Sequence, residues 1–72
     1  MAGDYKADPD FKRAAECWAS VQYALDAGEH ADEEEKGFRR FCGFVAEEYG
    51  VPESEVLRTA KRAGMDAYLE GC

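Results

Sequence analysis

The sequence predicts an all-α fold, a compact three-helix bundle that forms one domain. Apolar residues recur at intervals of three and four along three successive segments, which is the pattern of amphipathic helices. Glycines and a proline separate these segments, and no stretch shows the period of two that indicates strands. A length of 72 residues leaves room for one domain, and a hydrophobic content of 46% is too high for a disordered chain.

The first helix is expected over residues 9–27, after a polar arm of residues 1–8. Asp8 can cap its N-terminus, and Pro9 suits the first helical position. Gly28 is typical of the residue that follows a helix C-terminus. The apolar residues of this segment fall on one face and are assigned to the core: Phe11, Ala14, Trp18, Val21 and Leu25.

A second helix is expected over residues 32–49, with Asp32 as its N-cap and acidic residues in its first turn. The helix dipole favours carboxylates at that position. Gly37 and Gly43 weaken a helix relative to alanine, so we interpret them as positions of close helix packing. Gly50 ends the helix. Its apolar stripe consists of Phe38, Phe41, Cys42, Val45 and Tyr49.

A third helix is expected over residues 53–69, after a turn at Val51 and Pro52. Gly64 leaves two alternatives, a continuous helix or a break into a short terminal helix, and we favour the continuous one. The apolar stripe of this helix consists of Val56, Leu57, Ala60, Ala63, Ala67 and Tyr68.

The net charge of −7 is concentrated in the first half of the chain. Residues 1–36 hold 4 basic and 10 acidic residues, which gives −6, whereas residues 37–72 hold 5 and 6, which gives −1. Such a chain is repelled by phosphate backbones and anionic lipids and is attracted to basic protein surfaces. The alternative is that the charge only keeps a small protein in solution.

The residue pattern argues against an enzyme. The one histidine, His30, lies in a connector, and Cys17, Cys42 and Cys72 show no C-x-x-C spacing. Phosphate-binding loops and nucleophile motifs are missing, so we expect no catalytic residue, cofactor or metal. Unpaired cysteines, with neither a signal peptide nor a membrane-spanning stretch, favour a cytoplasmic protein. Whether Cys72 forms an intermolecular disulfide stays open.

A run of four acidic residues is the first candidate for partner binding: Asp32, Glu33, Glu34 and Glu35. It can steer the chain onto a basic surface, or it can be a well-capped, solvated helix start. In size and acidity the chain resembles the small inhibitor proteins of phages, anti-CRISPR proteins among them. That resemblance implies a non-enzymatic inhibitor or adaptor that docks on a basic, nucleic-acid-binding surface of a partner protein, and this is the function we favour.

Residues 42–61 resemble the helix-turn-helix motif of bacterial and phage repressors. The matching positions are Ala46, Gly50, Val51 and Val56, which allow two helices to approach, turn and lock together. Thr59 departs from the usual aliphatic residue, and Glu53 places a negative charge where phosphate would approach.

The helix-turn-helix resemblance implies the alternative function, a small DNA-binding transcriptional regulator that acts as a dimer. Its base-contacting residues would be Ser54, Arg58 and Lys61, with Arg62 near a phosphate. A structural subunit of a larger assembly is a third possibility that the sequence does not separate from protein binding.

Apolar residues that miss the stripes define a second candidate face for partner binding. Met65 and Leu69 share one side of the third helix with Arg58 and Arg62, and Phe44 lies at the margin of the second-helix stripe. Arginine among apolar side chains is typical of protein interfaces. Met65 and Leu69 can instead be buried, either by a break at Gly64 or in a homodimer.

Overall fold

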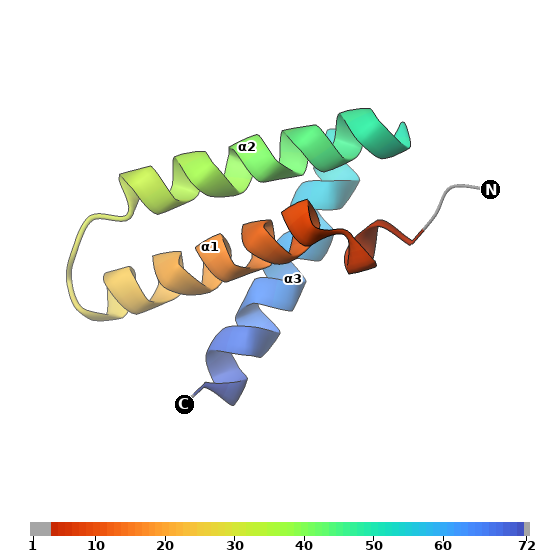
Figure 1. The fold of residues 1–72 in the computed structure, drawn as a ribbon. Helices are drawn as coiled ribbons and strands as arrows, with labels where there is room; N and C mark the ends of the chain where they lie inside the picture. The colour runs from red at the N-terminus through yellow and green to blue at the C-terminus, as the bar shows by residue number, and fades with distance from the viewer. Residues whose placement is uncertain (1–3, 72) are drawn as a thin grey trace.

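Three helices make up the structure, a computed structural model that describes residues 4–71 (Figure 1). They are α1 (Pro9–Asp26), α2 (Asp32–Tyr49) and α3 (Glu53–Glu70), preceded by a single 3-10 turn, η1 (Tyr5–Ala7). No strand occurs in this part of the chain. The predicted all-α three-helix bundle is therefore confirmed, with each helix within one residue of its expected bounds.

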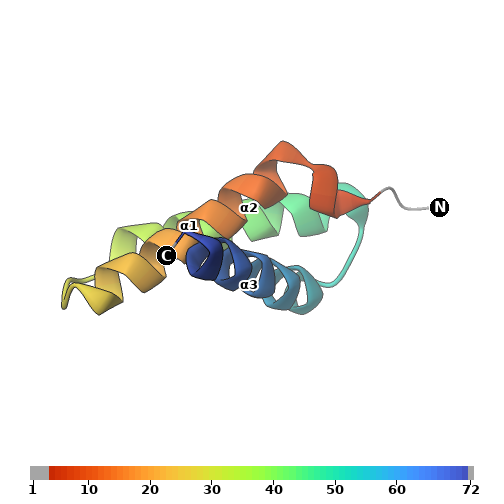
Figure 2. The same cartoon turned by 90° about the horizontal axis from the view of Figure 1, so that it is seen from below.

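The helices form a layer of two with the third crossing it. α1 and α2 run antiparallel and side by side, and α3 passes across them at an angle (Figure 1). Figure 2, seen from below, places α3 on one side of this pair. α1 packs against both of the other helices, whereas α2 and α3 share a smaller contact. The molecule is elongated, with extents of 41 × 23 × 17 Å.

The core lies where the three apolar stripes meet. Its largest fully buried side chains are Phe38, Cys42, Val45 and Val56, so the stripes of α2 and α3 point inward there as expected. Ala67, assigned to the α3 stripe, is instead exposed, because it lies in the last turns of α3. Trp18 of α1 extends the core and packs its ring against Phe38, with 4.9 Å between ring centroids. Burying such side chains stabilises a fold by roughly 1.5–3 kcal/mol each.

The expected polar arm is instead partly folded onto the bundle. The ring of Tyr5, in η1, contacts the rings of Phe11 and Tyr49 at 5.6 and 6.1 Å between centroids. Its hydroxyl donates a hydrogen bond to Thr59 Oγ1 at 3.3 Å. A single aromatic residue in a polar stretch has no periodicity, so the pattern could not reveal this contact. Residues 1–3 of the expected arm lie outside the described residues.

The turns between helices rely on glycines in the left-handed conformation. Gly28 has φ +75° after α1, and Gly50 has φ +65° after α2, as their positions predicted. The expected N-cap of α2 is wrong. Ala31, whose side chain is buried, occupies that position without a side-chain capping hydrogen bond, and Asp32 is the first helical residue.

The close helix contact occurs at Gly64, through which α3 continues unbroken. A Cβ atom at Gly64 would lie 2.7 Å from the carbonyl oxygen of Ala15 and 2.7 Å from Cβ of Trp18. Gly43 faces open space, and a Cβ at Gly37 would make an ordinary contact. The interpretation of Gly37 and Gly43 as close-packing positions is therefore wrong, and the continuous third helix is confirmed.

The expectation that Leu25 belongs to the core is wrong, since its side chain is 59% exposed. The reason is the angle at which α3 crosses α1. α3 meets α1 closely at Ala15, and its last turns then pack towards Tyr23, whose ring lies 4.9 Å from that of Tyr68. Val21 is the last buried residue of α1, so the end of the α1 stripe stays uncovered.

Candidate functional site

The end of the molecule where α1 connects to α2 is strongly acidic. The connector is compact, because the Glu29 amide donates to the Ala24 carbonyl at 2.8 Å and the Gly28 amide donates to Leu25 at 3.1 Å. This turn brings the last residues of α1 next to the first turn of α2 (Figure 1). We call this surface the acidic end. Its carboxylates belong to Asp26, Glu29, Asp32, Glu33, Glu34 and Glu35.

These carboxylates are largely uncompensated. All are exposed except Glu34, which is half-buried. Only Glu35 forms an ion pair within the described part of the chain, with Arg39 Nη2 at 3.2 Å. Both partners are exposed, so this pair contributes little stability and leaves most of the negative potential in place.

Leu25 adds an apolar side chain to the acidic end. It is exposed beside Asp26 and one turn before the connector. Sequence reasoning missed it as a surface residue, because its spacing is that of the core stripe. The direction of α3, which decides its exposure, leaves no local signal in the sequence.

A second charged surface, the basic groove, lies between η1, the start of α1 and α3. It has a volume of about 570 Å³ and is lined by the cations Lys6, Arg58 and Arg62. Phe11 and Ala63 also line it, together with Asp66.

The structure brings four of the five predicted apolar and basic face residues together. Arg58 and Arg62 line the groove, and helical spacing places Met65, half-buried, and Leu69, 62% exposed, on the same side of α3.

Phe44 does not join that face. It is 50% exposed on α2 and packs against Phe41 of its own helix. The inward side of α2 is marked by Cys42, whose side chain is fully buried. Phe44 follows Cys42 by two residues, about 200° around the helix, so it points away from the core.

The segment with helix-turn-helix resemblance forms two helices joined at Gly50. The Val51 amide donates to the Ala46 carbonyl at 3.1 Å, which closes the turn. Ser54, Arg58, Lys61 and Arg62 are all exposed on α3. Lys61 nevertheless has a partner inside the chain, since its Nζ lies 4.9 Å from the centre of the Trp18 ring.

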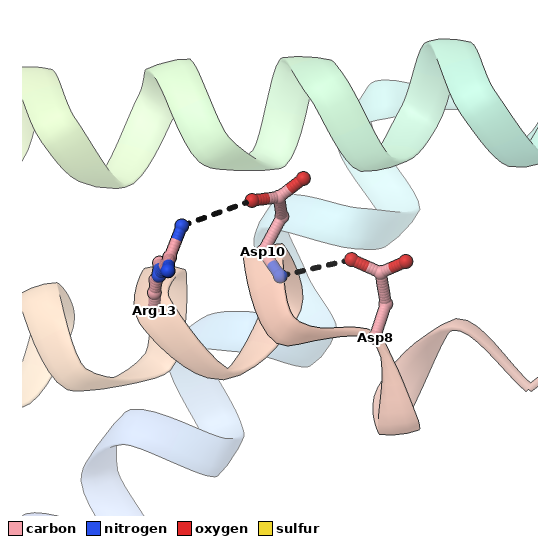
Figure 3. A network of polar contacts seen from close by, with 3 residues as sticks. All are labelled: Asp8, Asp10 and Arg13. Carbon is pink, nitrogen blue, oxygen red and sulfur yellow. Dashed lines mark hydrogen bonds and ion pairs between the residues drawn. The ribbon is translucent and has the colours of Figure 1, made fainter.

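One cluster of carboxylates lies outside these surfaces, where α1 begins beside the last turns of α2. Oxygens of Asp8, Asp10 and Glu48 lie within 4.8 Å of one another. Asp8 accepts a hydrogen bond from the Asp10 amide at 2.8 Å, and Asp10 pairs with Arg13 at 3.7 Å; both contacts are drawn as dashed lines in Figure 3. The Tyr49 hydroxyl donates to the other oxygen of Asp8 at 2.8 Å.

These contacts give the carboxylate cluster a structural function. Asp8 caps α1 and ties it to α2, and its hydrogen bond raises the pKa of Tyr49, with burial adding to the shift. Sequence reasoning assigned Asp8 only as a cap, because Glu48 approaches it through packing alone.

The two described cysteines have suppressed thiol chemistry. Burial raises the pKa of Cys42 to about 12. Burial, and then the nearby carboxylate of Glu16, raises the pKa of Cys17. Both thiols are therefore protonated at neutral pH and are poor nucleophiles. Cys72, for which the sequence leaves an intermolecular disulfide open, lies outside the described residues.

Comparison of the chain with protein-family models, curated proteins and solved structures finds no match. Among the helices of residues 4–71, none combines the length and the apolar character that a membrane-spanning segment needs.

Proposed function

We propose that this chain is a non-enzymatic protein-binding module, an inhibitor or adaptor, that docks through its acidic end on a basic surface of another protein. The observation that carries the proposal is the exposed Leu25 within a surface of carboxylates, of which only Glu35 is ion-paired among residues 4–71. The basic surface would be of the kind that binds nucleic acid, where a dense set of carboxylates competes with phosphates.

Charge and apolar contact have separate effects in such an interface. The carboxylates accelerate encounter with a basic surface and orient the chain on it. An apolar side chain surrounded by a polar rim supplies the buried contact that slows dissociation. Leu25 is suited to this contact because its side chain is already exposed and is not needed in the core of the free protein.

A titration with a labelled basic peptide, Lys-Leu-Lys-Lys-Leu-Lys, tests the proposal. One variant replaces Asp32, Glu33, Glu34 and Glu35 with their amides. The matched control replaces Glu16, Glu47, Glu48 and Glu70 with glutamine. Either variant changes the net charge from −7 to −3, because four negative charges are removed.

The two variants have the same net charge and differ only in which surface loses its carboxylates. We expect the first to weaken peptide binding by about tenfold at low salt, and the control by about twofold. Leu25→Ser should weaken binding by a further factor of about three or more. Equal affinities of the two charge variants would refute docking through the acidic end.

DNA binding is the second candidate, and the left-handed Gly50 turn with exposed Arg58 supports it. The test is a titration against a labelled random-sequence DNA duplex at about 50 mM salt, where helix-turn-helix proteins bind non-specifically at roughly micromolar levels. Micromolar binding that fades steeply with salt, and that weakens in Arg58→Ala and Lys61→Ala, would replace protein docking as the leading function.

A further inference from the structure

The basic groove concentrates unpaired cations in an acidic protein. Lys6 reaches it from η1, and Arg58 and Arg62 reach it from successive turns of α3. None of the three forms an ion pair with a carboxylate among residues 4–71. Acidic residues outnumber basic ones by 16 to 9, so internal partners would be easy to supply.

We propose that this groove and the adjoining face of α3 bind a short extended peptide from a second protein, with acidic, acidic and apolar residues at alternate positions. This site does not rest on the function proposed for the acidic end. The acidic end of the same chain cannot fill the groove, because Leu25 follows Phe11 by fourteen positions in α1, about 21 Å along the helix.

The spacing of the arginines selects the acidic positions. Arg58 and Arg62 are one turn apart, which separates them by about 6 Å along α3. Side chains at alternate positions of an extended peptide are about 6.6 Å apart and point the same way. Two such carboxylates can each meet one guanidinium, in the paired hydrogen-bond geometry that arginine favours.

The next alternate position of the peptide meets apolar surface. It falls about 6.6 Å beyond Arg62, whereas Met65 and Leu69 follow Arg62 by about 4.5 and 10.5 Å along the helix. Leu69 is largely exposed, so an apolar peptide side chain would cover it. A third carboxylate at this position would approach Asp66 and be repelled.

The surroundings favour a peptide over a nucleic acid. A duplex carries one negative charge per about 1.7 Å and would extend past the groove along α3. Glu53, Glu55 and Glu70 lie along that helix and would repel it. A pentapeptide confines its two charges to the cationic part of the surface.

Fluorescence anisotropy with Glu-Thr-Glu-Thr-Leu, labelled at its N-terminus and amidated at its C-terminus, at about 50 mM salt tests the site. We expect Arg58→Glu with Arg62→Glu to weaken binding by about tenfold or more. The matched control, Lys36→Glu with Arg40→Glu, alters two exposed cations of α2 and should weaken it by about twofold through net charge alone. All four positions are exposed, and circular dichroism checks that both variants remain helical.

Peptide variants test the order of the residues. Lys-Thr-Lys-Thr-Leu should not compete, and replacing the leucine with serine should weaken binding about threefold. That loss should vanish in Leu69→Ser. The amide variant of Asp32 to Glu35 should bind the peptide at least as well as the natural chain, which separates this site from the acidic end.

Three results would overturn the proposal. The first is equal binding by the groove variant and its α2 control. The second is competition by the lysine peptide, and the third is stronger binding of a random DNA duplex that displaces the peptide from the arginines.

Discussion

The two ends of the bundle differ in how far their apolar side chains are covered. We call the end where α1 begins and α2 turns into α3 the closed end. Phe11, Val45 and Val56 are buried there, and Tyr5 packs against the core cluster to which they belong. At the acidic end, α1 and α2 extend past their contact with α3, and Leu25 is exposed among carboxylates. A chain of this length cannot bury all of its apolar surface, so the apolar side chains of one end are covered and Leu25 at the other end stays exposed.

The crossing of α3 produces this difference. Gly64 lets α3 approach the backbone of α1 at Ala15, which fixes an oblique crossing. An apolar stripe at helical spacing is then covered only as far as the crossing extends. Substitutions on the two sides of that boundary should therefore have unequal effects.

Truncation of a core side chain should give the largest effect. Phe38→Ala should lower the free energy of unfolding by about 3–5 kcal/mol, because the ring is fully buried. Leu25→Ala should lower it by less than about 1 kcal/mol. Urea denaturation at neutral pH measures both. A loss of about 2 kcal/mol or more in Leu25→Ala, as for the truncation of a buried leucine, would show that the acidic end is part of the core.

Two glycines that lie inside helices should respond to alanine substitution in opposite directions. Gly64→Ala should destabilise the fold by about 2–3 kcal/mol, because the new methyl group would overlap the Ala15 carbonyl oxygen. Gly43→Ala meets open space and should stabilise by about 0.5–1 kcal/mol. Thermal denaturation measures both changes, and an unchanged stability in Gly64→Ala would refute the close crossing of α3 and α1.

Alkaline pH should destabilise the core through Cys42. Its folded pKa of about 12 exceeds the ordinary thiol value of 9.0, so the folded state retains the proton that the unfolded state loses. The resulting stability is fully present below pH 9 and is lost as pH rises towards 12, at up to about 1.4 kcal/mol per pH unit. Denaturation series at pH 8, 9.5 and 11 should show this slope flattened in Cys42→Ala. An equal slope in the variant would contradict the assignment.

The hydrogen bond between Tyr49 and Asp8 should give the smallest of these effects. Tyr49→Phe removes the donor and keeps the ring, so we expect a loss of about 1 kcal/mol. Tyr23→Phe, on the opposite side of the bundle from this carboxylate, is the control and should change stability by less than about half of that. Equal stabilities of the two variants in chemical denaturation would show that this hydrogen bond does not stabilise the closed end.

The sequence was sufficient for the parts of the fold that depend on local signals. Intervals of three and four defined the three stripes, and Gly28, Gly50 and Pro52 marked where helices end and begin. The second candidate face was also predictable for α3, because Arg58, Arg62, Met65 and Leu69 share a side of any continuous helix. Phe44 belongs to another helix, and its direction relative to α3 depends on packing.

The remaining features depend on how the helices cross. The exposure of Leu25, the close approach at Gly64 and the docking of Tyr5 each involve residues far apart in the chain. The basic groove is similar, because Lys6 and Arg58 are fifty-two positions apart. Local periodicity contains no information on a crossing angle, so these could not be predicted.

The proposal that the acidic end binds a partner, and that the closed end does not, is tested most directly by nuclear magnetic resonance. Amide shifts of the ¹⁵N-labelled chain would be followed during addition of the Lys-Leu-Lys-Lys-Leu-Lys peptide. We expect changes confined to residues 24–36, with the amides of Phe11, Val45 and Val56 unmoved. Changes centred on the closed end or the basic groove, or none at all at saturating peptide, would contradict the account.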